Sequence, residues 1–276
     1  MSTTLLIDHP AWTPQPDGTL ARLVTDGTRA WLARWNRSSL DWQTLDPTGG
    51  PAPTVRRTPA ADLPNRAPAP LLEALAALGT VERLPNPSLW DSVTTALLRR
   101  IIRAAQARAL YRRWCTTYGR RYDTSAGTLA AAPSPEVVLA LEGDAPYRQV
   151  GALFHKKALP AAAAAYLDHS AEWSALDPDD LVKALQDVPG IGPWTAAAAA
   201  ADFTGDYSVY PHHDLAVRTW ATQAAPGLAW PETEQAFARR WHRWAPDRPQ
   251  LHALTTFTLA WGTHAPTVEH ERPSLT

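Results

Sequence analysis

Five residues, Pro189-Gly190-Ile191-Gly192-Pro193, constrain the fold of this chain more than any other stretch. Two glycines two residues apart permit backbone conformations that other residues avoid, and proline is excluded from helix interiors. A helix must therefore end near Pro189, and Pro193 suits the first position of the next helix. The sequence predicts two helices joined by a tight turn whose outward-facing N–H groups suit a phosphate oxygen.

The residues before this turn predict an amphipathic helix over Asp177–Gln186. Asp177 is a typical N-cap residue, and Pro178 follows it at the first helical position. Leu181, Leu185 and Val188 share one helical face. A glycine pair alone would be weak evidence for a phosphate-binding turn, but an amphipathic helix directly before it strengthens that interpretation.

Composition indicates a globular protein. The 276 residues are 45% hydrophobic and 19% charged, which is typical of a chain that buries a core. A single cysteine, Cys115, excludes an internal disulfide framework, a cysteine-based zinc site and a four-cysteine iron–sulfur cluster. No long apolar run or signal peptide is evident, so we expect a cytoplasmic protein that does not enter the membrane.

The net charge of −1 argues mildly against nucleic-acid binding, but the charge is unevenly distributed. The segment from Ser92 to Tyr122 contains no acidic residue, whereas Glu142–Asp187 is rich in acids. Its eight arginines are Arg99, Arg100, Arg103, Arg108, Arg112, Arg113, Arg120 and Arg121. They indicate either a local basic surface for a polyanion or an ordinary solvated helix face.

The first third of the chain is predicted to be β. Thr19–Thr25 and Arg29–Trp35 flank Asp26-Gly27, a strong hairpin signal, and a third strand is expected over Ser39–Leu45. Frequent prolines then indicate a linker over residues 46–70, with one short edge strand at Pro53–Thr58.

The rest of the chain is predicted to be helical, ending in a terminal tail over residues 265–276. The expected helices span Leu71–Leu78, Leu89–Tyr118 (in one or two pieces), Pro133–Leu141, Tyr147–Tyr166, Asp177–Gln186, His213–Ala225, Pro231–Trp244 and Pro249–Trp261.

Asp214 is the main candidate for chemistry. It lies in the predicted first turn of a helix, where the positive end of the helix dipole stabilises a carboxylate. From the local pattern alone, the simpler interpretation is that Asp214 only caps or charges the start of that helix. The neighbouring His212 and His213 diverge around the helix axis and have no partner at i+4, so the pattern argues against a metal site there.

The stretch from Leu185 to Ala196 (LQDVPGIGPWTA), followed by Tyr210 to Arg218 (YPHHDLAVR), resembles the signature of the HhH-GPD superfamily of base-excision DNA glycosylases. Within it, the chain is most similar to the AlkA-type 3-methyladenine DNA glycosylase II branch. The resemblance implies a mainly α fold with two helical subdomains around a cleft and an N-terminal antiparallel β-rich domain, α+β overall. The implied parts are 1–70 (β-rich domain with linker), 71–90 with 204–276 (subdomain with the catalytic aspartate), and 91–203 (subdomain with the hairpin).

The resemblance implies a monofunctional DNA glycosylase that flips a damaged, alkylated base out of double-stranded DNA and hydrolyses its N-glycosidic bond. By similarity Asp214 is the catalytic carboxylate. Bifunctional members carry a lysine where this chain has Trp194, so abasic-site lyase activity is not expected. The protein is expected to be a monomer. The alternative is a catalytically degenerate protein that only binds DNA or a lesion through the hairpin.

The resemblance also implies further site residues. Trp194, Phe257 and Trp261 are expected at the base pocket, although Trp194 could instead be an ordinary core aromatic. Arg100 and Ile101 fall where the family places the wedge that fills the gap left by the flipped base. The residues expected to contact DNA at the hairpin are Val188, Gly190, Ile191, Gly192 and Thr195.

No cofactor is expected to be required. The family's hairpin often holds a monovalent cation, and by position Na⁺ or K⁺ would meet the main-chain carbonyls of Gln186, Val188 and Gly190.

Three positions depart from the family pattern. Arg99 and Arg100 stand where Gly-Gln is common, and Ala198 stands where an aromatic pocket residue is expected. These differences fall where the lesion would be recognised, so the sequence leaves the identity of the damaged base open.

Overall fold

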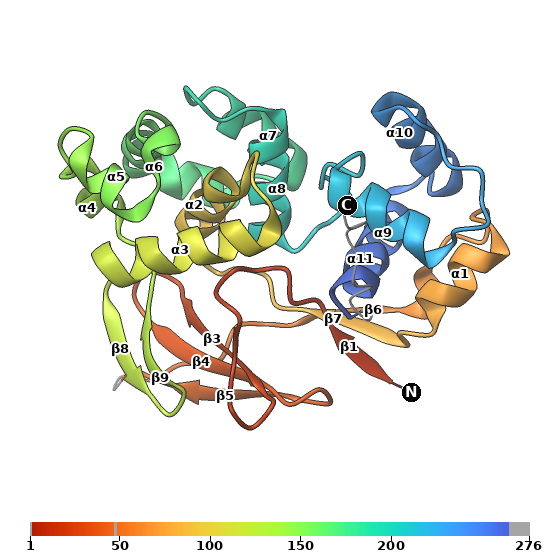
Figure 1. The fold of residues 1–276 in the computed structure, drawn as a ribbon, viewed down its shortest axis with the longest axis horizontal. Helices are drawn as coiled ribbons and strands as arrows, with labels where there is room; N and C mark the ends of the chain where they lie inside the picture. Colours follow the sequence, from red (N-terminus) through yellow and green to blue (C-terminus); the bar gives the residue numbers. More distant parts are fainter. Residues whose placement is uncertain (1, 47–48, 265–276) are drawn as a thin grey trace, which may run out of the picture.

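The computed structural model describes residues 2–46 and 49–264 as helices gathered above small β-sheets (Figure 1). Helices α2 to α8, between residues 89 and 204, lie on one side of the molecule, and α1 (Ala69–Ala76) and α9 to α11, between residues 215 and 264, lie on the other. The sheet formed within residues 13–44 lies beneath the first group. The sheet that contains Thr3–Leu5 lies beneath the second. The expected α+β architecture is therefore observed. The predicted tail, 265–276, lies outside the described residues.

The predicted N-terminal hairpin is confirmed. Strands β3 (Leu20–Thr25) and β4 (Ala30–Trp35) pair antiparallel, and β5 (Leu40–Thr44) and β2 (Thr13–Pro14) complete the four-stranded sheet. Buried Trp12, Val24 and Trp35 form a small core on this sheet, separate from the main helical core.

Besides β2, four further strands were not predicted. Strands β1 (Thr3–Leu5) and β7 (Thr80–Arg83) pair in parallel, and β6 (Arg56–Pro59) joins the other edge of β7. The sheet therefore takes a strand from beyond residue 70, and β6 lies slightly later than expected. Strands β8 (Arg121–Thr124) and β9 (Gly127–Ala130) form a hairpin within the predicted helical region.

The helices follow the predicted order, and the Leu89–Tyr118 stretch forms two helices, one of the two alternatives expected. Two differences are found. The expected helix over Tyr147–Tyr166 is broken at Gly151, which has a φ of 80°, and at a short 3₁₀ turn, Leu153–His155. Asp214 precedes rather than enters its helix. The helices are α1 (Ala69–Ala76), α2 (Leu89–Arg99), α3 (Ala104–Tyr118), α4 (Pro135–Leu139), α5 (Ala145–Val150), α6 (Ala158–Ala175), α7 (Pro178–Gln186), α8 (Pro193–Thr204), α9 (Leu215–Ala224), α10 (Glu234–Trp244) and α11 (Arg248–His264).

Helix α8 is the centre of the larger helical group. Its alanines 196–201 are all buried, and they let α2 approach closely because their side chains are small. Helix α7 packs on the same helix, which fixes the hairpin between them. In the other group α9 packs on α11 and α1. Within the described residues, no helix combines the length and the apolar character needed to cross a membrane.

A buried polar network joins α8 to β7. The Asp202 carboxylate, 6% exposed, accepts hydrogen bonds from Arg83, from Asn86 (3.1 Å) and from Ser92 (3.0 Å). Burial alone would raise the pKa of Asp202, but the positive charge of Arg83, the further charge of Arg22 and the hydrogen bond from Arg83 together outweigh burial and hold that pKa below its usual range. The pair is therefore ionised on both sides, inside the protein.

We expect Asp202→Asn to destabilise the fold by about 3–5 kcal/mol, because it leaves the Arg83 guanidinium buried without its carboxylate. Urea unfolding measures this difference. Asp180→Asn is the control, since it removes an exposed ion pair with Lys183 that water and salt screen, and it should change stability little. Equal effects for the two variants would contradict the structural importance of the buried pair.

Candidate active site

The glycine hairpin has the geometry that the sequence predicts. Asp177 caps α7 by accepting hydrogen bonds from the N–H groups of residues 179 (3.0 Å) and 180 (2.9 Å). The turn after α7 is closed by the Ile191 N–H bond to the Val188 carbonyl (3.0 Å), and Gly192 is the N-cap of α8. Gly190 has a φ of 91°, and a Cβ added there would lie 2.8 Å from the Cβ of Ala158. Only glycine fits this position.

The hairpin presents main chain rather than side chains. Val188, Ile191 and Thr195 are buried and anchor the turn to the core, so their side chains do not reach the surface. Gly190 is exposed and Gly192 is half-buried. Any contact between this turn and a polyanion is therefore made by backbone groups, as the predicted phosphate-binding role requires.

Asp214 occupies the N-cap position of α9, yet its side chain makes no capping hydrogen bond. Asp177 at the corresponding place in α7 does cap its helix, as do Ser88, Ser134 and Thr233 in theirs. An N-cap bond stabilises a helix by about 1 kcal/mol. The interpretation of Asp214 as only a helix cap is therefore wrong, because its carboxylate is directed elsewhere.

The carboxylate of Asp214 is held by two neutral donors from different elements. The Trp194 indole N–H, at the start of α8, donates to Oδ1 at 3.0 Å. The Tyr210 hydroxyl, in the loop before α9, donates to Oδ2 at 3.1 Å. Asp214 itself remains partly exposed, so its carboxylate is both fixed and accessible. Sequence reasoning quoted Tyr210 in the motif but assigned it no role.

Burial and the charge of Asp214 keep the Tyr210 hydroxyl protonated, so that it can donate a hydrogen bond. Burial raises the pKa of Tyr210, and the negative charge of Asp214 raises it further, so the tyrosine keeps its proton at neutral pH. Burial lowers the pKa of His212 to about 4, with the charges of His242 and His213 adding to the shift. His212 is therefore neutral near pH 7, and Trp194 and Tyr210 are the groups that bind the carboxylate directly.

Ile101, in the loop between α2 and α3, has the form of a wedge. It is 83% exposed and has a φ of 70°, the left-handed region that β-branched residues avoid. Such a conformation costs about 1–3 kcal/mol and is characteristic of functional sites. Ile102 beside it is also partly exposed.

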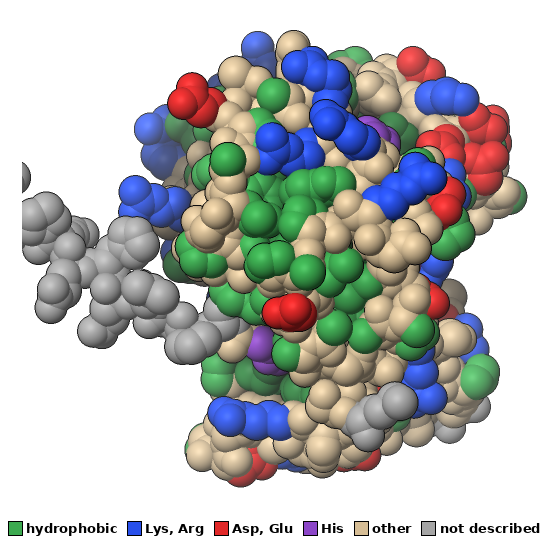
Figure 2. Space-filling view, turned by 90° about the vertical axis from the view of Figure 1, so that its right-hand side faces the viewer, with side chains coloured by type: hydrophobic (Ala, Val, Ile, Leu, Met, Phe, Trp, Pro, Cys, Tyr) green, Lys and Arg blue, Asp and Glu red, His purple; other side chains and the backbone are tan. Residues whose placement is uncertain are grey.

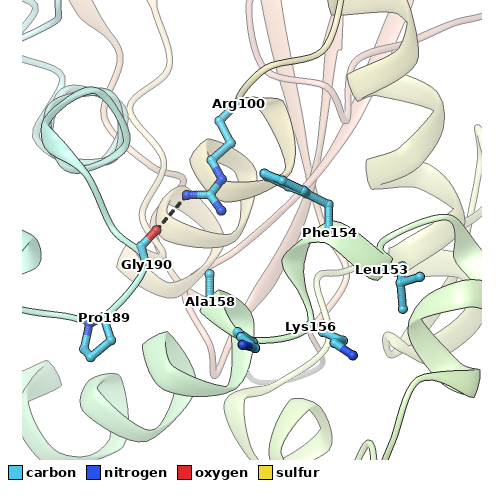
Figure 3. Close-up of a pocket in the computed structure, with 8 residues that line it drawn as sticks. Arg100, Leu153, Phe154, Lys156, Ala158, Pro189 and Gly190 are labelled. Atoms are coloured by element: carbon cyan, nitrogen blue, oxygen red, sulfur yellow. Dashed lines mark hydrogen bonds between the residues drawn. The ribbon is translucent and has the colours of Figure 1, made fainter.

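Arg100 does not project with Ile101. Its Nη1 donates to the Gly190 carbonyl at 2.8 Å, and its guanidinium lies 5.0 Å from the centre of the Phe154 ring (Figure 3). The expectation that Arg100 itself fills a lesion gap is therefore wrong for this structure: the side chain ties the Ile101 loop to the hairpin. Neither Arg99 nor Arg100 forms the freely solvated face considered above, because both are half-buried.

A pocket of about 460 Å³ lies beside the hydrogen bond between Arg100 and Gly190, and its lining combines apolar residues with three cationic side chains. Phe154 is 64% exposed at its edge and was not singled out in the sequence, although it lies two residues before Lys156-Lys157. The pocket is lined by Arg100, Leu153, Phe154, Lys156, Lys157, Ala158, Pro189 and Gly190 (Figure 3). Positive charge thus collects next to the hairpin.

The three residues predicted for the base pocket differ in how far they are buried. Trp194 is half-buried beside Asp214, and Trp261 on α11 is half-buried against the main core. Phe257 is fully buried within that core, so the expectation that it lines an open base pocket is wrong. Ala198 is also buried, one turn along α8 from Trp194.

The carbonyls predicted to hold a monovalent cation fit that role poorly. The Gly190 carbonyl already accepts the Arg100 guanidinium, and the Val188 carbonyl accepts the Ile191 N–H. A cation placed beside a guanidinium would be repelled. Among the side chains that the structure describes, no group of three or more His, Cys, Asp or Glu could hold a metal ion.

One face of the molecule combines apolar and basic side chains. Hydrophobic side chains gather across its middle, and Lys and Arg side chains border them above and below (Figure 2). The formal net charge of −1 therefore conceals local basic regions.

Comparison with known protein families and with curated proteins finds no match to this sequence. Solved structures do match. The 8-oxoguanine glycosylase/lyase of Clostridium acetobutylicum, in complex with double-stranded DNA, superimposes with a TM-score of 0.69 over 94% of this chain and 89% of that one, at 10% identity. The 3-methyladenine DNA glycosylase of Archaeoglobus fulgidus gives 0.66 over 91% and 90%, at 15% identity.

The Schizosaccharomyces pombe 3-methyladenine DNA glycosylase in complex with abasic DNA gives a TM-score of 0.51 over 65% of this chain and 82% of that one, at 19% identity. The chain has the fold of DNA glycosylases. At these identities the comparison establishes the fold, and the coverage extends to both helical groups and the N-terminal sheet in the two longer matches.

We expect Gly190→Ala to destabilise the protein by about 1–3 kcal/mol and to weaken duplex DNA binding, because a Cβ at this φ is strained and meets Ala158. Thermal unfolding and fluorescence anisotropy measure the two effects. Gly192→Ala is the matched control for stability, since no atom lies within 4 Å of its added Cβ. A Gly190→Ala protein as stable as Gly192→Ala would contradict the hairpin geometry.

Proposed function

We propose that this protein is a monofunctional DNA glycosylase of base excision repair, which flips a damaged, alkylated base from double-stranded DNA and hydrolyses its N-glycosidic bond. The observation that carries the proposal is Asp214: an accessible carboxylate that forgoes capping its own helix and is fixed by Trp194 and Tyr210. A protein that only gripped DNA through the hairpin would have no use for this arrangement.

The chemistry follows from the charge of the group. When an N-glycosidic bond breaks, positive charge develops on the sugar, and a fixed anion stabilises that charge without having to reorganise. Asp214 supplies the anion and orients the attacking water. Its two donors are neutral, so they fix the carboxylate without cancelling its charge.

The residue beside Asp214 supports the monofunctional proposal, because it is a tryptophan and not a lysine. A lyase step requires a lysine that forms a Schiff base with the sugar. The lysines of this chain are Lys156, Lys157 and Lys183. Lys156 pairs with Asp144 and Lys183 pairs with Asp180, while Trp194 holds the position beside Asp214.

An alkylated purine is the substrate class that the site favours. Such bases are electron-poor, and an aromatic face attracts them. Trp194 lies next to the catalytic carboxylate and offers the half-buried indole that this recognition needs. Two of the similar structures are 3-methyladenine DNA glycosylases, whereas a third is an 8-oxoguanine glycosylase/lyase.

In the proposed complex, Ile101 enters the base stack and the main chain of Gly190–Gly192 holds a backbone phosphate. The hydrogen bond from Arg100 to Gly190 connects the Ile101 loop to the hairpin. The side chain that enters the base stack and the turn that binds the phosphate are therefore linked. The Arg100 guanidinium adds positive charge at the hairpin.

We expect Asp214→Asn to lower the single-turnover excision rate by about 100-fold or more while duplex binding is retained, because the fixed negative charge is lost and the surface is not. The substrates are duplexes containing 3-methyladenine, 7-methylguanine, hypoxanthine, 1-methyladenine or uracil, scored for abasic sites. Asp177→Asn is the control: it replaces one good N-cap with another and should excise normally.

If wild-type protein binds these duplexes but leaves every base in place, the chain is a DNA-binding protein without glycosylase activity. If Asp214→Asn excises at the wild-type rate, the catalytic assignment is wrong.

We expect Ile101→Gly to reduce excision from duplex DNA by about 10- to 100-fold, since the energy of unstacking is no longer offset by the wedge. Excision from single-stranded substrate should be unchanged, and the protein should be at least as stable as wild type because glycine adopts this φ without strain. Leu167→Ala, an exposed apolar side chain on α6, is the control. Equal losses on both substrates would refute the wedge.

A further inference from the structure

We propose that Tyr210 is a positioning residue that, together with Trp194, fixes the plane and direction of the Asp214 carboxylate for catalysis. This inference rests on the proposed glycosylase function and concerns a residue to which the sequence motif assigned no role. The hydroxyl acts on Asp214 and reaches the reaction only through it.

Two donors are needed to orient a carboxylate. With one hydrogen bond the group can still turn about its Cβ–Cγ bond, whereas a donor on each oxygen fixes its plane. A carboxylate offers about four lone-pair sites, so one donor per oxygen leaves sites free for water and the sugar. Trp194 and Tyr210 come from α8 and from the loop before α9, so they hold Asp214 from two independent supports.

Tyr210 is itself held in place. It is 3% exposed, and its ring stacks on Tyr207 with centroids 5.3 Å apart and 16° between the ring planes. The Tyr207 hydroxyl accepts a hydrogen bond from Arg83 (2.6 Å) and donates one to Asp8 (2.6 Å). The buried network around Asp202 therefore extends, through one aromatic contact, to the donor that orients Asp214. Rigid support of this kind is what a catalytic group requires.

Tyr210 also prevents a competing conformation. An aspartate at an N-cap normally bonds to the free N–H groups of its own helix, as Asp177 does in α7. Without the Tyr210 hydroxyl, the Asp214 carboxylate is free to turn toward α9. The loss of one hydroxyl should therefore affect the rate of base excision more than DNA binding.

The test is Tyr210→Phe, which keeps the ring and its stacking and removes only the hydroxyl. We expect the single-turnover excision rate at saturating protein to fall about tenfold, the size of effect that a difference of about 1.4 kcal/mol produces. The dissociation constant for the damaged duplex should stay within about twofold of wild type. The substrate is whichever duplex wild-type protein excises.

Tyr118→Phe is the matched control, because it also removes one tyrosine hydroxyl, and that hydroxyl bonds to the Pro146 carbonyl (2.8 Å), away from the site. It should excise at the wild-type rate.

An excision rate for Tyr210→Phe equal to wild type overturns the proposal. Equal rate losses in Tyr210→Phe and the control also overturn it, because they indicate a general structural role. If wild-type protein excises no base, the glycosylase proposal and this one fail together; an active wild type with an unimpaired Tyr210→Phe overturns this one alone.

Discussion

Two opposite charges, Arg83 on β7 and Asp202 on α8, meet inside the protein with almost no exposure to water. Removing Arg83 would leave the Asp202 carboxylate buried without its closest cation, and removing Asp202 would leave Arg83 with only the longer contact to Asp8 (3.5 Å), so the strand and the helix are held together strongly. Helix α8 begins at the glycine hairpin and carries Trp194 in its first turn. The same Arg83 binds Tyr207, which supports Tyr210. One ion pair thus fixes both the hairpin helix and the loop that leads to Asp214.

Two features of the proposed site reduce local stability. Asp214 forgoes the capping bond that Asp177, Ser88 and Thr233 make in their helices, and Ile101 adopts a strained backbone conformation on the surface. Each feature costs on the order of 1 kcal/mol or more. That both lie in the elements predicted to act on DNA favours a functional cause.

Local patterns predicted the hairpin, the N-terminal sheet and most helices, because capping residues, prolines and glycines act over a few positions. They could not predict β1 and β7, whose pairing joins residues 77 positions apart, or the break at Gly151. The motif located Asp214 and Trp194 but not their hydrogen bond, nor the role of Tyr210. The hydrogen bond and the role of Tyr210 depend on which side chains the folded chain brings together. The same holds for the burial of Phe257 and for the hydrogen bond between Arg100 and Gly190.

In the proposed mechanism Asp214 directs water to the sugar, and the Trp194 indole stands where a lyase would carry an amine. Incubation of wild-type protein with a 3-methyladenine duplex, in the presence and absence of borohydride, separates hydrolysis from lyase chemistry. We expect abasic sites to accumulate, the DNA strand to stay intact until alkali is added, and no protein–DNA adduct to be trapped. A covalent adduct, or strand cleavage before alkali treatment, would rule this mechanism out.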